Sequence, residues 1–250
     1  MTEDAVLAVQ GVSVRFGGNL VLKEVSLSAP VGFMGLIGPN GAGKTTLLNV
    51  VSGYVRPAQG EVLLGGERLS GLRPHRVARR GLARTFQTPK LVRELTVLEN
   101  VMLGVDGRAG WLRSGSASAA VERSDQLLER FGLRKWRDRE AAALPLASQK
   151  VVEVARALVS NPSVVLLDEP AAGLGVEDVE RLIAPLQLHA QEHDLAVVII
   201  EHDVELISRL CRRVAVLDFG TLIAEGPPGE VLERPEVVNA YLGAGFAAVG

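Results

Sequence analysis

The sequence of 250 residues has few cysteines, few aromatic residues and no long apolar run. A single cysteine, Cys211, excludes a disulfide framework within the chain and a cysteine-based zinc or iron–sulfur site, and it favours a reducing compartment. The longest apolar run, residues 195–200, is far shorter than the roughly 20 residues that span a bilayer. With 47% hydrophobic residues, the sequence instead predicts a globular protein with a buried core.

Neither sign of charge predominates, because 27 Lys+Arg stand against 29 Asp+Glu. Sequence-independent nucleic-acid binding needs a basic face and stacking aromatic side chains, so we expect no nucleic-acid partner. One local exception is a basic stretch without acids: Arg68, Arg73, Arg76, Arg79, Arg80, Arg84, Lys90 and Arg93. A solvated face is the favoured interpretation, and a surface facing anionic lipid or a membrane protein stays open.

Apolar segments indicate an α/β protein. Residues 33–37, 164–167 and 196–200 are apolar throughout, as in central strands of a covered parallel sheet. Residues 7–14 and 61–64 predict further strands, and residues 214–224 predict a hairpin.

The middle of the chain has a different, helical texture. Residues 104–118 are rich in Gly, Ser and Ala and predict a loop, whereas residues 121–131 have apolar side chains at helical spacing. We predict that residues 89–158 form a helical subdomain inserted into a core of residues 1–88 and 159–250.

Residues 38–45 read GPNGAGKT and match the phosphate-loop pattern G-x-x-x-x-G-K-[ST], after an apolar segment and before an expected helix. Glycines expose backbone N–H groups, Lys44 reaches the terminal phosphates and Thr45 holds Mg²⁺ in such loops. A glycine-rich turn without a ligand is the alternative. The residues expected to contact the nucleotide here are Gly38, Pro39, Asn40, Gly41, Ala42, Gly43, Lys44, Thr45 and Thr46.

Two acids, Asp168 and Glu169, follow the apolar run 164–167. Since ligands bind beyond the carboxyl ends of strands in open α/β sheets, these acids are candidates for catalysis rather than solvated surface charges. Asp168 is expected to hold Mg²⁺ and Glu169 to orient and polarise the attacking water. Glu169, His202 and Lys44 are the candidate catalytic residues.

His202 and Gln87 complete the candidate site. His202 follows the apolar run 196–200, where its imidazole can donate to a γ-phosphate oxygen. Gln87 lies where the predicted core ends and the helical insertion begins. Its amide oxygen could ligate Mg²⁺ together with Thr45 and Asp168. Taken alone, Gln87 would be an ordinary loop residue.

Together and in this order, these residues resemble the ATP-binding subunits of ABC transporters, over residues 7–243. On this resemblance, residues 38–45 are the Walker A loop and residues 168–169 end the Walker B strand. Gln87 is then the Q-loop residue and His202 the H-loop residue. The resemblance implies a P-loop NTPase core with a mostly parallel sheet, an N-terminal antiparallel β portion and an inserted α-helical subdomain.

Other segments resemble the ATPases of branched-chain amino-acid importers more specifically. Phe16 stands where the family places an aromatic side chain that stacks on adenine. The segments that carry the subfamily resemblance are RTFQ at 84–87, LTVLENVMLG at 95–104, DEPAAGL at 168–174, IEHDVELI at 200–207, VLDFGTLIAEGPPGEVL at 216–232 and AYLG at 240–243. The resemblance implies import of branched-chain amino acids or a related small polar solute.

The resemblance also implies partners. It implies a dimer of two ATPase subunits with two ATP molecules between them, integral membrane permease subunits, and a solute-binding protein that acts indirectly. Such a subunit lies in the cytoplasm, peripheral on the inner face of the cell membrane.

The chain departs from the family at the signature, where LPLAS replaces LSGGQ at residues 144–148. Pro145 replaces a serine and offers neither hydroxyl nor N–H, and Ala147 replaces a glycine. Gly175 stands where the family often has Asp or Asn, and Pro185 is expected to kink a helix at residues 177–193. Because the signature completes the partner's site, these departures favour a heterodimer, with a homodimer left open.

Two other classes of protein would show features that this sequence lacks. A soluble ABC-type regulator or nucleic-acid factor usually has tandem cassettes or a long coiled-coil insertion, and this chain has one cassette and no heptad stretch. A GTPase would offer an Asn-Lys-x-Asp motif, and no asparagine here precedes a lysine.

Overall fold

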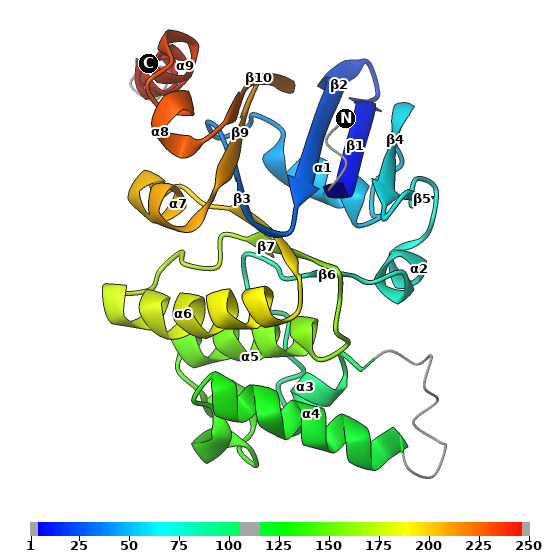
Figure 1. The fold of residues 1–250 in the computed structure, drawn as a ribbon, viewed down its shortest axis with the longest axis vertical. Helices are drawn as coiled ribbons and strands as arrows, with labels where there is room; N and C mark the ends of the chain where they lie inside the picture. The colour runs from blue at the N-terminus through cyan, green and yellow to red at the C-terminus, as the bar shows by residue number, and fades with distance from the viewer. Residues whose placement is uncertain (1–4, 106–115, 247–250) are drawn as a thin grey trace. The chain divides into compact units, whose positions relative to one another are not determined.

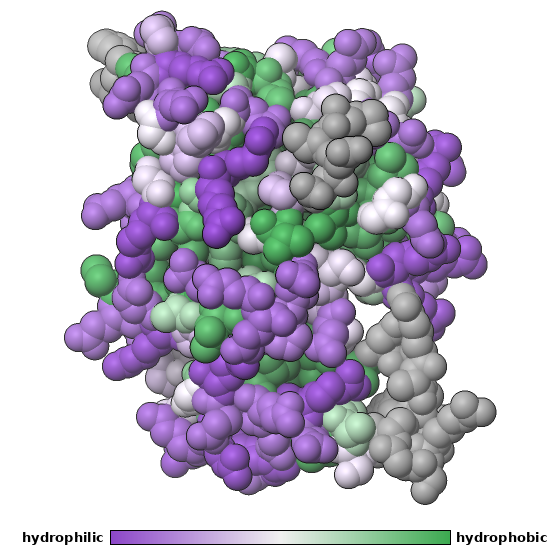
Figure 2. All heavy atoms as spheres, viewed as in Figure 1, coloured by the Kyte–Doolittle hydropathy of each residue, from purple (hydrophilic) through white to green (hydrophobic). Residues whose placement is uncertain are grey.

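The computed structural model describes residues 5–105 and 116–246. The chain forms two compact units, one of Met1–Val77 with Ala196–Gly250 and one of Ala78–Leu195 (Figure 1). In the described part of the chain, no helix is long and apolar enough to cross a bilayer. Hydrophilic side chains predominate on the face drawn in Figure 2, and apolar ones form smaller areas.

The first unit contains the predicted antiparallel β portion. Its strands, in the order β2-β1-β4-β5, are β1 (Ala5–Phe16), β2 (Asn19–Pro30), β4 (Gln59–Leu64) and β5 (Glu67–Arg68). Phe16 pairs with Asn19 across a two-residue Gly-Gly loop, which is a preferred hairpin connection. Strand β2 was not predicted from the sequence, although Val25, Leu27 and Ala29 are buried at the alternate positions typical of a strand.

The first unit also contains the predicted parallel strands around the phosphate loop. Strand β3 (Gly32–Ile37) pairs in parallel with β8 (Ala196–Ile200) and β9 (Arg213–Asp218), and β9 pairs antiparallel with β10 (Thr221–Gly226). All five residues of β8 are buried, which confirms the prediction of a covered central strand. The helices of this unit are α1 (Lys44–Val51), α7 (Val204–Leu210), α8 (Pro228–Val231) and α9 (Pro235–Phe246).

The second unit contains the predicted helical insertion. A short parallel pair, β6 (Leu82–Arg84) with β7 (Val164–Asp168), accompanies the helices. Helix α2 (Pro74–Arg79) lies at the boundary between the two units. The further helical elements are α3 (Val97–Met102), α4 (Ser116–Arg130), η2 (Arg134–Trp136), η3 (Ala141–Ala143), α5 (Leu146–Leu158) and α6 (Val176–Glu192). Helix α3 packs against both α4 and α5.

Some predicted boundaries differ from the observed ones. The loop expected at 104–118 lies largely outside the described residues. Helix α4 begins at Ser116, so residues 116–118, which were expected to end the loop, are helical. Helix α6 continues through Pro185, at the position where a kink was expected. The final helix, α9, spans Pro235–Phe246.

Candidate nucleotide site

The phosphate loop joins β3 to α1, and its glycines are required by its backbone. Gly41 and Gly43 have φ angles of 79° and 105°, in the left-handed region that favours glycine. Gly38 has a φ of 144°, and a Cβ there would lie 2.0 Å from the carbonyl oxygen of Leu217. The loop therefore curls tightly and brings successive backbone N–H groups to the start of α1, as an anion nest does.

Lys44 is the first residue of α1, and its side chain folds back over the loop. Its Nζ donates to the carbonyl oxygens of Gly38 at 2.6 Å and Pro39 at 2.9 Å, and the residue is buried. Thr45 is exposed and Thr46 half-buried on the first turn of the same helix. This arrangement suits a triphosphate, because an ammonium and a hydroxyl lie at the positively polarised end of the helix.

A hairpin turn supports the loop from the side. Gly220 of the β9–β10 turn donates its N–H to Ala42 and accepts a hydrogen bond from the N–H of Lys23. Phe219 and Gly220 both have positive φ angles, as a type I′ hairpin turn requires. A Cβ at Gly220 would lie 2.0 Å from the carbonyl oxygen of Val21, so this position also requires glycine.

Phe16 ends β1, in the same unit, and its side chain is 53% exposed. An aromatic ring this open to solvent is available for stacking on a base.

Asp168 ends β7 and forms a buried ion pair. Its Oδ2 accepts from Nη2 of Arg84 at 3.0 Å, and both side chains are less than 10% exposed. Arg84 ends the neighbouring strand β6, so parallel pairing brings the two strand ends together. Assigning Arg84 to a basic surface was therefore wrong, since its guanidinium neutralises a buried carboxylate.

Glu169 and Gln87, assigned separately from the sequence, lie in contact. The side-chain amide of Gln87 donates to Glu169 Oε2 at 2.7 Å. Glu169 has a φ of 51°, which is strained for a residue with a side chain. The carboxylate thus leaves the strand direction at a sharp turn and is held by an amide 82 residues earlier in the chain.

Lys150 on α5 holds the backbone of that turn. This residue was not predicted from the sequence. Its buried ammonium donates to the carbonyl oxygens of Glu169 at 3.0 Å and Ala172 at 2.8 Å. A lysine among the apolar residues of a helix was the available signal, because a buried charge needs specific partners.

Glu153, one turn further along α5, holds the segment that contains Gln87. Its carboxylate accepts from the backbone N–H of Phe86 and of Lys90, and Arg156 pairs with it at 3.2 Å. Burial raises the pKa of Glu153, and these hydrogen bonds and charges oppose that shift. Helix α5 therefore fixes both the Gln87 segment and the Glu169 turn.

His202 follows β8 and is exposed. The buried carboxylate of Glu201 accepts from the N–H of His202 at 3.3 Å, and Asp203 caps α7 by accepting from the N–H of Leu206. The two acids that flank His202 thus shape the backbone around it.

The signature-aligned segment begins α5 directly. Pro145 is the N-cap residue and provides no side-chain hydrogen bond, and Leu146 is 49% exposed at the first helical position. The side chain of Gln149 donates to the carbonyl oxygen of Leu144 at 2.8 Å. Residues 144–149 therefore form a folded helix start that lacks the expected hydroxyl.

The predicted site residues fall into two groups. Phe16, the phosphate loop and His202 belong to the first unit, whereas Gln87, Asp168 and Glu169 belong to the second. Within the second unit, Gln87 and Glu169 are joined by a hydrogen bond, and convergence of the two groups on one phosphate stays a prediction.

Comparison with known proteins agrees with these features. The family model described as ABC transporter matches residues 22–172, and that described as Branched-chain amino acid ATP-binding cassette transporter matches residues 221–247. The High-affinity branched-chain amino acid transport ATP-binding protein LivG of Escherichia coli (strain K12) is 38% identical over 252 residues, which cover 95% of this chain and 98% of LivG.

Solved structures share the fold. The ADP conformation of MJ1267, an ATP-binding cassette of an ABC transporter, aligns with a TM-score of 0.84 and 30% identity over 96% of this chain and 99% of that chain. The dimeric post-hydrolysis state of the ATP-binding cassette MJ0796, bound to ADP and Pi, aligns with a TM-score of 0.77 and 26% identity over 89% and 98%.

A glycine-rich loop between a parallel strand and a helix, together with paired acids at the end of an apolar strand, defines a nucleotide-binding P-loop ATPase. On the family matches, this chain belongs to the ATP-binding subunits of ABC transporters, which are transport ATPases.

Proposed function

We propose that this chain hydrolyses ATP to drive a membrane importer of branched-chain amino acids. The cargo rests on the match of residues 221–247 to the branched-chain family model and on 38% identity to LivG. The observation that carries the hydrolytic role is the 2.7 Å hydrogen bond between Gln87 and Glu169, because it ties the candidate base to the segment that enters the helical subdomain.

The proposed mechanism places the ATP phosphates in the loop of residues 38–45, against its backbone N–H groups and Lys44. Phe16 stacks on the adenine, and Pro39 to Thr46 surround the phosphates. Lys44 exchanges its two carbonyl partners for phosphate oxygens, which are stronger acceptors because they are charged.

The second half of the mechanism uses residues beyond the loop. Glu169 accepts a proton from the attacking water and orients it, and His202 donates to a γ-phosphate oxygen. Release of phosphate breaks the His202 contact, and the Gln87 segment passes the change to the helical subdomain.

Thr45, Gln87 and Asp168 would hold Mg²⁺, which supplies positive charge to the β- and γ-phosphate oxygens. A hydroxyl, an amide oxygen and a carboxylate are the hard oxygen ligands that this ion takes. Two contacts of the second unit are compatible with this role. Gln87 bonds to Glu169 through its amide nitrogen, and Arg84 bonds to one of the two carboxylate oxygens of Asp168.

The proposed assembly is a dimer of ATPase subunits on the cytoplasmic face of the cell membrane, bound to permease subunits, with a solute-binding protein acting indirectly. A heterodimer is favoured, because Pro145 and Ala147 weaken the signature that this chain would contribute to its partner's site.

Uptake of labelled leucine, isoleucine and valine tests the proposal in cells that lack this chain. We expect uptake to fall, to return with the wild-type chain and with the control Glu177→Gln, and to stay low with Glu169→Gln. Glu177 is a suitable control because its side chain is 89% exposed. Normal uptake in the deletion strain would contradict the cargo, and rescue by Glu169→Gln would contradict the hydrolytic role.

A further inference from the structure

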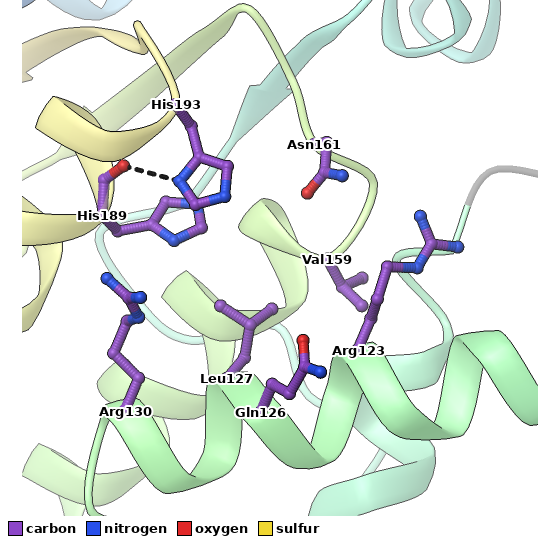
Figure 3. Close-up of a pocket in the computed structure, with 8 residues that line it drawn as sticks. All are labelled: Arg123, Gln126, Leu127, Arg130, Val159, Asn161, His189 and His193. Atoms are coloured by element: carbon purple, nitrogen blue, oxygen red, sulfur yellow. Dashed lines mark hydrogen bonds between the residues drawn. The ribbon is translucent and has the colours of Figure 1, made fainter.

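The second unit contains a cavity that the nucleotide chemistry does not use. Its volume is about 310 Å³, and it lies between α4, the turn that follows α5, and the C-terminal end of α6 (Figure 3). Arg123 and Arg130 reach it from α4, His189 and His193 from the end of α6, and Asn161 from the turn after α5. Among the described residues that line it, none is acidic.

Buried polar atoms at this cavity have no hydrogen-bond partner. They are Nδ1 of His189, Nη1 of Arg130 and Nε of Arg123. His189 is only 5% exposed, and its ring lies against the cavity in Figure 3. Because buried polar groups without partners cost free energy, these atoms are available to form hydrogen bonds with a ligand in the cavity.

The electrostatics of the cavity favour negative charge. The two histidine rings stack at 4.1 Å between centroids, and Nδ1 of His193 donates to the carbonyl oxygen of His189. Burial, followed by the charges of His193 and Arg130, lowers the pKa of His189 to about 4. A second positive charge is thus disfavoured at His189. Glu192 on α6 pairs with Nη2 of Arg130 at 2.6 Å and supplies one negative charge beside the cavity.

We propose that this cavity binds a small phosphate-bearing anion. Arginine side chains from α4, histidine side chains from the end of α6 and Asn161 from the turn after α5 line the space, and their N–H groups are donors that phosphate oxygens accept from. The volume lies at the lower end of the 300–1,000 Å³ typical of ligand sites, which suits inorganic phosphate or a small phosphomonoester.

Histidine ring NMR on the full chain tests the proposal, because the chain has four histidines and two line the cavity. Inorganic phosphate and glycerol 3-phosphate are titrated separately at constant ionic strength, with MgADP present to occupy the phosphate loop. We expect saturable shifts of His189 and His193 with at least one probe and no shift of His75. Tighter binding of glycerol 3-phosphate would identify a phosphomonoester as the ligand, and tighter binding of phosphate would identify the free anion.

Substitutions separate this site from general charge effects. Arg123→Gln and Arg130→Gln each should weaken binding at least tenfold. Arg134→Gln removes the same charge from an exposed side chain of the same unit and should leave the affinity unchanged. Non-saturable shifts, equal shifts with chloride or acetate, or equal loss of affinity with Arg134→Gln would overturn the proposal. Failure of MgADP to bind would instead contradict the proposed ATPase function, because His189 and His193 report their cavity independently.

Discussion

At the scale of single residues, two adjacent acids have different environments. Asp168 is buried and paired with Arg84, whereas Glu169 turns away from the strand with a φ of 51° and accepts a hydrogen bond from Gln87. Two residues that are adjacent in the sequence therefore have different partners: a cation holds the carboxylate of Asp168, and an amide lies beside that of Glu169.

Glu169→Gln should abolish ATP turnover while ATP binding survives. General base catalysis contributes about 10²–10⁴-fold, and the amide cannot accept the proton from water. Phosphate release and ATP retention on a filter measure the two properties, in the complete transporter. Glu177→Gln is the matched control on an exposed acid. Full turnover by Glu169→Gln would contradict the role assigned to Glu169.

Arg84→Met should destabilise the chain by about 3–5 kcal/mol, because it leaves the Asp168 carboxylate buried without its partner. Urea titration at neutral pH measures the free energy of unfolding. Arg181→Met is the control, since Arg181 forms only exposed ion pairs with Glu177 and Asp178, and it should change stability by less than about 1 kcal/mol. Equal effects of the two substitutions would show that the buried pair contributes little.

At the scale of elements, α5 connects the signature-aligned segment to the turn at Glu169. It begins directly after Pro145, and Lys150 and Glu153 point to backbone groups on two separate segments. A rigid helix fixed at both contacts can transmit movement from its N-terminal end to Glu169 and Gln87.

Lys150→Met should lower kcat for ATP about tenfold and leave KM nearly unchanged. Lys150 holds the backbone of Glu169, and a hydrogen bond from a charged donor contributes about 1.5–3 kcal/mol. Steady-state ATPase kinetics separate kcat from KM. Lys135→Met, on an exposed lysine beside Trp136, is the control. A raised KM with unchanged kcat would assign Lys150 to nucleotide binding instead.

At the scale of the whole molecule, some motifs of this chain follow the family pattern and others depart from it. The phosphate loop, Glu169 and His202 match the family, whereas the segment at 144–148 begins a helix without a hydroxyl cap. In the proposed heterodimer, the partner's own signature would complete the site at this chain's phosphate loop.

The purified chain alone should therefore hydrolyse ATP slowly. Combining Pro145→Ser with Ala147→Gly should raise turnover, because one donor to a developing charge contributes about 2–4 kcal/mol to the barrier. Phosphate release measured across chain concentrations tests this, with Ala142→Ser, an exposed neighbour, as the control. Fast turnover by the unaltered chain would show that the altered signature is harmless.

Local patterns in the sequence were sufficient for the phosphate loop, the central strands β3, β7 and β8, and the β9–β10 hairpin. Glycine spacing and unbroken apolar runs are properties of a few consecutive residues, so they can be read without the rest of the chain. Only the tertiary structure decided which side chains meet. The Gln87–Glu169 and Arg84–Asp168 contacts join residues 82 and 84 positions apart, and the Lys150 contacts and the His189 cavity depend on how helices pack. Such pairs form because folding buries their elements together, and no periodicity of a single segment encodes them.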